Sequence, residues 1–191
     1  NKRGLLIRRD CVEKVKEEKT NIFLVGMMGS GKTTVGKLLA NHLEWEFVDT
    51  DELIVEETGL SIPVLFKDKG EQYFRRLEQE AVARVARRRR MVVATGGGVI
   101  LNPENRQVLK ENGLVFYLRG TAQVLAARVG AGEGRPLLTG KELAPELERL
   151  LAVREKYYQE AADVVLETDA LTTGQVVAAI LEECAQRGIL S

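Results

Sequence analysis

The residues with the clearest chemical meaning form one run near the N-terminus, Gly26-Met27-Met28-Gly29-Ser30-Gly31-Lys32-Thr33. The run fits the pattern G-x-x-x-x-G-K-[ST] at every fixed position, follows the apolar stretch 22–25 and opens a helical pattern. Its glycines allow a tight turn whose backbone N–H groups converge on an anion, next to the partial positive charge of a helix N-terminus. Lys32 would reach the outer phosphates, and the Thr33 hydroxyl could ligate Mg²⁺. A chance glycine-rich turn is the alternative, but the order strand, turn, helix favours binding of a nucleoside triphosphate.

Two carboxylates follow the second apolar stretch, in the segment Phe47-Val48-Asp49-Thr50-Asp51. Ligands bind at the carboxyl ends of the strands in an open parallel sheet, and alternation would place Asp49 and Asp51 on one side of an extended chain. Beside a phosphate-binding loop, such a pair could hold Mg²⁺, directly or through water, and accept a proton from an attacking hydroxyl. Alternatively, Asp51 could be only the N-cap of the helix that follows it.

Further arginines and glycines could complete a site. Arg75 and Glu78 are neighbours at i and i+3 on a probable helix, where the ordinary interpretation is a solvated ion pair. The stretch 91–94 runs into Thr95-Gly96-Gly97-Gly98, and three glycines are more than a tight turn needs. They would remove side chains where a ligand could approach the backbone. Arg154, taken alone, would pass as an arginine on the surface of a helix.

The elements that must position these residues follow an alternating pattern. Apolar stretches at 22–25, 46–48, 91–94, 114–118 and 163–166 are separated by helical segments, which predicts a parallel sheet covered on both faces. Asn102 as N-cap, Pro103 and the stop at Gly113 predict a helix over 103–112. Thr121 and Thr172 are the expected N-caps of helices near 122–129 and 173–187, the second ending at Gly188.

The chain divides into a lead-in and one domain. Residues 1–20 are charged and receive no chemical role, and residues 21–191 form the expected domain. Three glycines within 130–134 predict a mobile loop that leads into Arg135-Pro136-Leu137-Leu138. We therefore expect a lid over about 129–141, whose closure would exclude water from the reaction.

Composition limits the class of function. The chain has 191 residues, 45% of them hydrophobic, which is enough for the core of one α/β domain. Its 28 basic and 28 acidic side chains give a net charge of +0, so no global field would attract nucleic acid or a membrane surface. The apolar runs are too short to span a bilayer, and the charged N-terminal residues lack the apolar core of a signal peptide. We expect a cytoplasmic protein that acts on a small molecule, with Cys11 and Cys184 as reduced thiols.

Taken in order, these segments resemble the shikimate kinase family, P-loop kinases of the nucleoside-monophosphate-kinase-like class. The resemblance covers residue 21 to about residue 181 and is carried by GMMGSGKTTVG at 26–36, FVDTD at 47–51, Phe74-Arg75, Gly96 to Gly98 and Arg135 to Leu138. It implies a three-layer α/β/α fold, with a five-stranded parallel sheet of order 2-3-1-4-5 and a mobile lid. It also implies a monomeric enzyme that transfers the γ-phosphoryl group of ATP to the 3-hydroxyl of shikimate, in the biosynthesis of chorismate and aromatic amino acids.

The resemblance further implies a role for individual residues. The nucleotide would be held by Gly29, Ser30, Gly31, Lys32, Thr33, Thr34, Arg128 and Arg135. Thr33 and Asp49 would serve Mg²⁺, and shikimate would be held by Asp51, Arg75, Gly97, Gly98 and Arg154. Lys32, Asp51 and Arg135 would be catalytic, with Asp51 as the base. The family often has a basic or polar residue near the adenine after the last strand, whereas residues 167–171 here contain no arginine.

Two other functions compete with this interpretation. Another small-molecule P-loop kinase, such as a gluconate or nucleoside monophosphate kinase, would share the phosphate-binding loop. Gluconate is also a polyhydroxy carboxylate, so paired arginines do not exclude it, although FVDTD and the three glycines favour shikimate. A regulatory module that only binds ATP would need neither Asp51 nor Arg135, and the sequence retains both.

Overall fold

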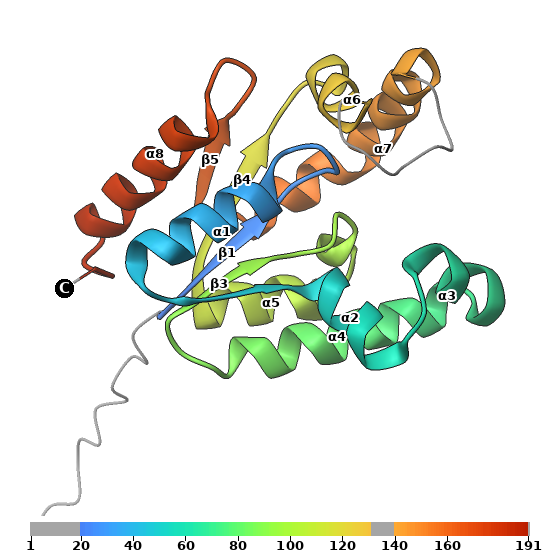
Figure 1. Cartoon of the computed structure of the whole chain (residues 1–191), viewed down its shortest axis with the longest axis horizontal. Helices are drawn as coiled ribbons and strands as arrows, with labels where there is room; N and C mark the ends of the chain where they lie inside the picture. The colour runs from blue at the N-terminus through green and yellow to red at the C-terminus, as the bar shows by residue number, and fades with distance from the viewer. Residues whose placement is uncertain (1–19, 131–139, 191) are drawn as a thin grey trace, which may run out of the picture.

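A sheet of five parallel strands forms the centre of the molecule, a computed structural model that describes residues 20–130 and 140–190 (Figure 1). The strands are β1 (Asn21–Val25), β2 (Glu46–Asp49), β3 (Met91–Ala94), β4 (Gly113–Arg119) and β5 (Val164–Glu167). They are arranged in the order β2-β3-β1-β4-β5, and all neighbouring strands are parallel. The predicted strands and the strand order implied by the family resemblance are confirmed.

Helices fill the connections between the strands. They are α1 (Lys32–Leu43), α2 (Thr50–Thr58), α3 (Ile62–Lys69), α4 (Glu71–Ala86), the short 3-10 helix η1 (Val99–Leu101), α5 (Pro103–Asn112), α6 (Ala122–Gly130), α7 (Gly140–Ala161) and α8 (Thr173–Gln186). The predicted caps are present, because the Asn102 side chain accepts a hydrogen bond from the Glu104 amide and Thr172 forms a capping box with Gln175.

The two faces of the sheet carry separate hydrophobic clusters, as strand alternation requires. On one face, Ile22 and Leu24 of β1 pack with residues of α1 and α8, among them Leu39 and Ile180. On the other face, Phe23 and Val25 pack with residues of α4, α5, α6 and α7. The fold is therefore the predicted three-layer α/β/α arrangement, and its core fixes where each strand ends.

A third, smaller cluster joins α2, α3 and α4 beyond the edge strand β2. It contains Ile54, Leu65, Phe74 and Ala81, all buried. Figure 1 shows α3 and α6 at the end of the molecule toward which the strand arrows point. Elements at both sides of that end can therefore reach across the carboxyl ends of the strands, where ligands bind in such sheets.

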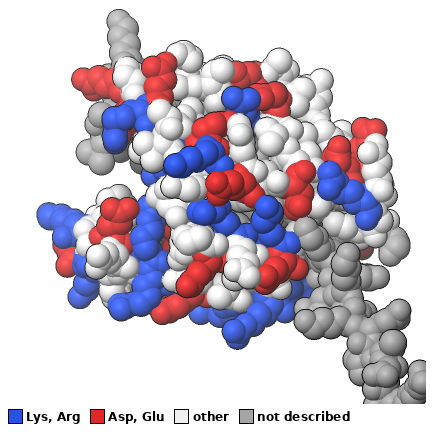
Figure 2. All heavy atoms as spheres, turned by 180° about the vertical axis from the view of Figure 1, so that it is seen from behind, with Lys and Arg blue, Asp and Glu red and all other residues white. Residues whose placement is uncertain are grey.

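A buried asparagine, Asn21, joins two segments at the opposite end of the strands, where the central strand β1 begins. The Asn21 amide donates to the carbonyl oxygens of Ala86 (3.2 Å) and Arg88 (2.7 Å), and its oxygen accepts from the Met91 amide (3.1 Å). These bonds fix the turn that carries the exposed arginines 87–90, far along the strands from the phosphate-binding loop. Positive and negative side chains are interspersed on the face in Figure 2. None of the helices in the described ranges has the length and apolar character needed to cross a membrane.

Candidate active site

The phosphate-binding loop, residues 26–31, connects β1 to α1. Gly29 has φ +81°, and a Cβ there would lie 2.6 Å from the carbonyl oxygen of Leu125, so only glycine fits this turn. The first hydrogen bond of α1 runs from the Val35 amide to the carbonyl of Gly31 (2.8 Å). The amides of residues 32–34 precede that bond and have no acceptor within the helix. They form the anion-binding end of α1 that the sequence predicts.

Lys32 folds back over this loop. Its ammonium donates to the carbonyl oxygens of Gly26 (2.8 Å) and Met27 (3.0 Å) and lies 3.4 Å from the hydroxyl of Ser30. The positive charge is therefore held beside the amides that would receive a phosphate, where phosphate oxygens could take the place of the loop carbonyls.

Thr33 and Asp49 meet across the gap between α1 and β2. The Thr33 hydroxyl donates to Asp49 Oδ2 at 2.7 Å. The described residues contain no group of three or more His, Cys, Asp or Glu side chains that could hold a metal. Mg²⁺, however, commonly binds through one or two protein oxygens, together with water and substrate phosphates. The Thr33 hydroxyl and the Asp49 carboxylate are the oxygen ligands that a hydrated Mg²⁺ beside nucleotide phosphates would need.

The start of α2 differs from the expectation for the two aspartates. Asp49 is the N-cap, because its Oδ1 accepts from the amides of Asp51 (2.9 Å) and Glu52 (3.3 Å). The proposal that Asp51 itself caps the helix is therefore wrong. The alternation argument is also wrong, because the chain is already helical from Thr50 and Asp51 lies in the first helical turn.

Asp51 nevertheless faces the loop after β3. Its Oδ1 lies 2.7 Å from the position that a Cβ on Gly96 would occupy. The neighbouring Thr50 is fully buried, and its hydroxyl accepts from the Gly96 amide (3.2 Å). The beginning of α2 is thus tied to the glycine loop, and the Asp51 carboxylate lies against this loop.

The Arg75–Glu78 pair is not the solvated pair that is usual at this spacing. Arg75 Nη1 donates to Glu78 Oε1 at 2.9 Å, and the Glu78 side chain is only 1% exposed. Glu71 contacts the same guanidinium at 3.4 Å from the solvent side. The rings of Phe74 and Phe66 lie 5.4 and 6.0 Å from it. Arg75 is therefore held on several sides, as a residue that must present a fixed fork would be.

Glu78 is a site residue that sequence reasoning did not identify as one. Burial raises the pKa of its carboxyl group, and the nearby Asp51 charge raises it further, while Arg75 and Arg154 oppose the shift. Its second oxygen, Oε2, is buried without a hydrogen-bond partner among the described residues. The spacing to Arg75 was visible in the sequence, but the burial depends on α2 and on the loop after β3.

Two of the three glycines after β3 make room for other side chains of the protein. A Cβ on Gly96 would lie 2.8 Å from Glu78 Oε2, and one on Gly98 would lie 2.4 Å from Arg75 Nη1. Of the three, only Gly97 has neighbours at ordinary contact distance: a Cβ there would lie 3.6 Å from both Arg154 Nη1 and the carbonyl oxygen of Gly26. The expectation that all three make room for a ligand is thus corrected: Gly96 and Gly98 make room for charged side chains.

Helix α7 brings a second guanidinium to the same loop. Arg154 Nη1 lies 3.7 Å from the sulfur of Met27, in the phosphate-binding loop. One turn further along α7, the Tyr158 hydroxyl donates to the carbonyl of Gly97. Arg75 from α4 and Arg154 from α7 therefore both border the loop Gly96–Gly98, so Arg154 is more than a surface arginine.

On the nucleotide side, Arg128 of α6 contacts the chain after β5. Its Nη1 donates to the Thr168 hydroxyl (3.1 Å) and its Nη2 to the Thr168 carbonyl (2.6 Å). This contact places Arg128 next to the segment where the family often has a basic or polar residue.

Arg135 lies outside the described residues, as do positions 131–139 of the expected lid, the lead-in up to residue 19 and Cys11. Cys184 is a free, buried thiol on α8.

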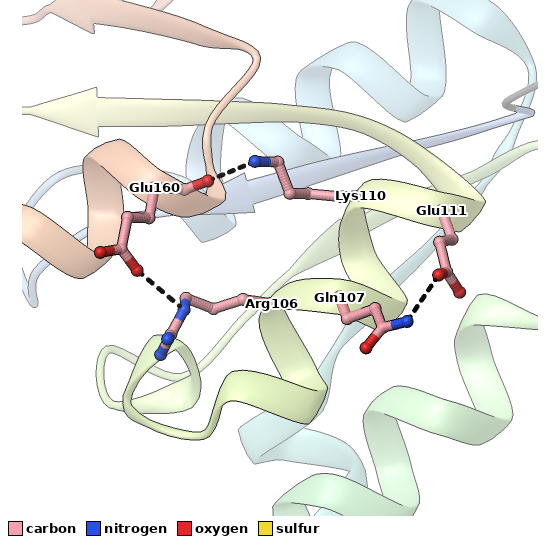
Figure 3. Close-up of a pocket in the computed structure, with 5 residues that line it drawn as sticks. All are labelled: Arg106, Gln107, Lys110, Glu111 and Glu160. Carbon is pink, nitrogen blue, oxygen red and sulfur yellow. Dashed lines mark hydrogen bonds and ion pairs between the residues drawn. The ribbon is translucent and has the colours of Figure 1, made fainter.

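A separate pocket between α5 and α7, of about 510 Å³, does not contribute to this arrangement (Figure 3). Its charged groups contact one another: Arg106 pairs with Glu160 at 3.4 Å, and Lys110 donates to the carbonyl of Glu160 at 2.6 Å. Gln107 donates to Glu111 at 2.8 Å. These contacts hold the end of α7 against α5. The side chains that line the pocket therefore serve the packing of these two helices.

Comparison with known proteins gives a consistent result. A family model described as shikimate kinase matches residues 28–185. A shikimate kinase from Dechloromonas aromatica is 42% identical over 87% of this chain and 91% of its own length. One from Legionella pneumophila is 44% identical over 85% of this chain and 93% of its own length. A solved shikimate kinase from Acinetobacter baumannii, in complex with shikimate, has 37% identity and a TM-score of 0.82, covering 90% of this chain and 96% of its own.

The rival kinase class is more distant. A gluconokinase from Sinorhizobium meliloti has 19% identity and a TM-score of 0.59, a likeness that extends to the fold alone. The family model covers most of the chain, and the relatives from Dechloromonas aromatica and Legionella pneumophila exceed 40% identity over more than nine-tenths of their own lengths. The phosphate-binding loop, the strand order and these relatives agree that the chain is an enzyme, a kinase, and that it belongs to the shikimate kinase family.

Proposed function

We propose that this chain transfers the γ-phosphoryl group of ATP to the 3-hydroxyl of shikimate, giving shikimate 3-phosphate and ADP. The observation that carries the proposal is the placement of two guanidinium groups, Arg75 from α4 and Arg154 from α7, beside the loop Gly96–Gly98. Planar guanidinium forks match a carboxylate, and shikimate has one carboxylate opposite its ring hydroxyls. A polyhydroxy acid bound there would extend its hydroxyls toward Asp51 and the phosphate-binding loop.

The phosphate groups of ATP would bind to the amides of residues 29–34 and to Lys32. For phosphoryl transfer, a protein mainly has to align the reactants and neutralise their charge. This loop would contribute to both. Mg²⁺ beside Thr33 and Asp49 would neutralise charge on the β- and γ-phosphates. Arg128 would lie against the adenine. Arg135, assigned from its motif alone, would add positive charge from the lid.

Asp51 would accept the proton of the attacking hydroxyl. The oxygen of that hydroxyl forms the new bond to phosphorus, the bond between the γ-phosphorus and the bridging oxygen breaks, and ADP leaves with the electron pair. Two observations support Asp51 as the base: it lies against Gly96, next to the proposed acceptor site, and it is in the first turn of the helix whose cap, Asp49, contacts Thr33. Gly97 and Gly98 would contact the acceptor through their backbone.

A coupled assay of ADP release with different acceptors tests this function. Purified protein with ATP and Mg²⁺ should release ADP steadily when shikimate is added, and at background rate with gluconate or a nucleoside monophosphate. Mass spectrometry of the product should show one phosphate on the acceptor. Faster turnover with gluconate than with shikimate would assign the chain to a different acceptor, and ADP release independent of any acceptor would make it an ATPase.

The cellular setting is also proposed. We infer a monomeric enzyme in the cytoplasm whose only substrates are small molecules. The balanced charge of the chain supports the absence of nucleic-acid and membrane partners. Light scattering at micromolar concentration measures the molar mass in solution. A monomer should give 21.2 kDa, and twice that mass would show that the protein is a dimer.

A further inference from the structure

Tyr158 on α7 touches two parts of the proposed acceptor site, although no motif points to it. Its hydroxyl donates a hydrogen bond to the carbonyl oxygen of Gly97. The same hydroxyl interacts with the Arg154 guanidinium, whose charge and hydrogen bond both act on the pKa of the tyrosine. Arg154 and Tyr158 are four residues apart, so they share one face of the helix. The hydroxyl thus connects the glycine loop to the guanidinium on α7.

The hydroxyl of Tyr158 keeps its proton at neutral pH. The side chain has no exposed surface, and burial raises its pKa to about 12 despite the opposing positive charge of Arg154. A neutral hydroxyl supplies one donor and accepts through its oxygen. Its proton is directed to Gly97, and its oxygen remains available to Arg154.

The ring of Tyr158 packs against a second aromatic ring. It stacks on Tyr117 of β4, with ring centroids 4.8 Å apart and planes 15° apart. The Tyr117 hydroxyl in turn donates to Glu155 Oε2 at 2.7 Å, and the other oxygen of Glu155 pairs with Arg119 at 2.9 Å. The ring stack restrains the Tyr158 side chain, so its hydroxyl stays directed at the glycine loop, whereas the Tyr117 hydroxyl is directed to Glu155.

We propose that Tyr158 is a positioning residue for the acceptor, which holds the Gly97–Gly98 peptide and Arg154 in the geometry that binds shikimate; this rests on the proposed function. A loop of three glycines has no side chains of its own to anchor it, so its backbone conformation depends on such bonds. A hydrogen bond to the Gly97 carbonyl also polarises that peptide, which makes the N–H of Gly98 a stronger donor. The two polar partners of its hydroxyl, Gly97 and Arg154, both belong to the acceptor side.

The substitution Tyr158→Phe tests this role, because it keeps the ring and its stack and removes only the hydroxyl. We expect the KM for shikimate to rise about 10-fold, the effect of losing one well-formed buried hydrogen bond. The KM for ATP and kcat at saturating shikimate should stay within about twofold of the parent. Tyr117→Phe is the matched control: it removes the other hydroxyl of the same stack and should leave the KM for shikimate unchanged.

A second readout does not depend on turnover. In ¹⁵N-labelled protein, Tyr158→Phe should shift the amide resonance of Gly98 and speed its hydrogen exchange, while Tyr117→Phe should affect neither. If Tyr158→Phe does not fold, 3-fluorotyrosine at position 158, a stronger donor of the same shape, should lower the KM for shikimate and leave that for ATP unchanged.

Three results would overturn the role of Tyr158. They are an unchanged KM for shikimate in the folded variant, an equal rise in both KM values, and the same rise in Tyr117→Phe. An unchanged KM for shikimate in the 3-fluorotyrosine protein would have the same consequence. A parent protein that releases no ADP with shikimate would instead refute the proposed function, and the resonance of Gly98 would still report whether Tyr158 holds the loop.

Discussion

The phosphate side and the acceptor side of this site are built in opposite ways. Most of the phosphate side comes from one contiguous segment, residues 26–34, which Asp49 joins through its hydrogen bond with Thr33. The acceptor side combines side chains and backbone from α2, α4, α7 and the loop after β3, up to about a hundred residues apart in sequence. Lys32, Thr33 and Asp49 on the phosphate side are partly exposed. On the acceptor side Asp51 and the two arginines are also partly exposed, but Glu78 and Tyr158, which contact those arginines, are buried.

This difference predicts different consequences of substitution. On the phosphate side, each group would act directly on the reacting phosphate, so its loss should lower kcat with little effect on folding. On the acceptor side, apart from the proposed base Asp51, each group is held by another, so substitutions should change the affinity for shikimate and, where buried, the stability. The variants below test this division, in order of decreasing expected effect.

Lys32→Ala should have the largest effect. The ammonium is held over the loop carbonyls of Gly26 and Met27, and its proposed contribution is positive charge at the phosphates. Removing one such group typically lowers kcat by about 10²-fold or more. Steady-state kinetics measures this loss, and circular dichroism and thermal unfolding should show a folded protein. A folded variant with near-parental turnover would exclude Lys32 from the mechanism.

Asp51→Asn should lower kcat by about 10²-fold while ATP binding, measured by calorimetry, stays normal. The amide keeps the shape of the side chain but cannot accept the proton of the hydroxyl. Because the cap of α2 is Asp49, we expect little change in thermal stability. A variant that keeps full activity and loses stability would make Asp51 a structural residue of the helix start.

Gly98→Ala should raise the KM for shikimate by about 10-fold, because a Cβ at this position would lie 2.4 Å from Arg75 Nη1 and displace the guanidinium. Gly174→Ala provides the control: that glycine is in the first turn of α8, and a Cβ there would meet nothing within 4 Å. The control should match the parent in both KM values. An unchanged KM for shikimate in Gly98→Ala would mean that the position of Arg75 does not govern acceptor binding.

Glu78→Gln should separate affinity from stability. The pKa of Glu78 is raised in the folded protein, so the folded state holds its proton more tightly than the unfolded state. Its contribution to stability is therefore present below the ordinary pKa of 4.5 and is lost as the pH rises through the raised value. Relative to the glutamine variant, the parent should lose stability over that range. At pH 7, the variant should be at least as stable but bind shikimate a few-fold more weakly, because Arg75 loses its charged partner.

Urea unfolding of both proteins between pH 4 and pH 8 checks the sign of this effect. A parent that gains stability relative to Glu78→Gln as the pH rises would mean that the ion pair with Arg75 outweighs burial. An unchanged KM for shikimate would mean that Arg75 keeps its position without the charge of Glu78.

The phosphate side could be predicted from sequence because its chemistry is local. The glycines, Lys32 and Thr33 lie within a few residues of one another, so their spacing alone predicts the turn and the helix start. Alternation of apolar and helical segments likewise predicts the strands and faces of the sheet, since these depend on short-range periodicity. The family resemblance supplied the strand order, which spacing alone does not contain.

The acceptor side could be predicted only in part. Sequence spacing gave Arg75 and Glu78 as neighbours, but not the burial of Glu78, which depends on α2 and the loop after β3 packing over it. It assigned the glycines to a ligand, whereas two of them accommodate charged side chains of the protein. Tyr158 has no local signature, because its partners Gly97 and Tyr117 lie 61 and 41 positions away along the chain. Such contacts are set by tertiary packing.

The most direct test of the account asks whether the paired arginines recognise a carboxylate. We would measure kcat/KM for shikimate and for its analogue with the carboxylate reduced to an alcohol, in the parent and in Arg75→Lys. The parent should prefer the acid by about 10²-fold, because the alcohol would leave two guanidinium groups without their anion. Arg75→Lys keeps the charge but loses the planar fork, so it should impair use of the acid far more than use of the alcohol. Equal use of acid and alcohol by the parent would contradict the account.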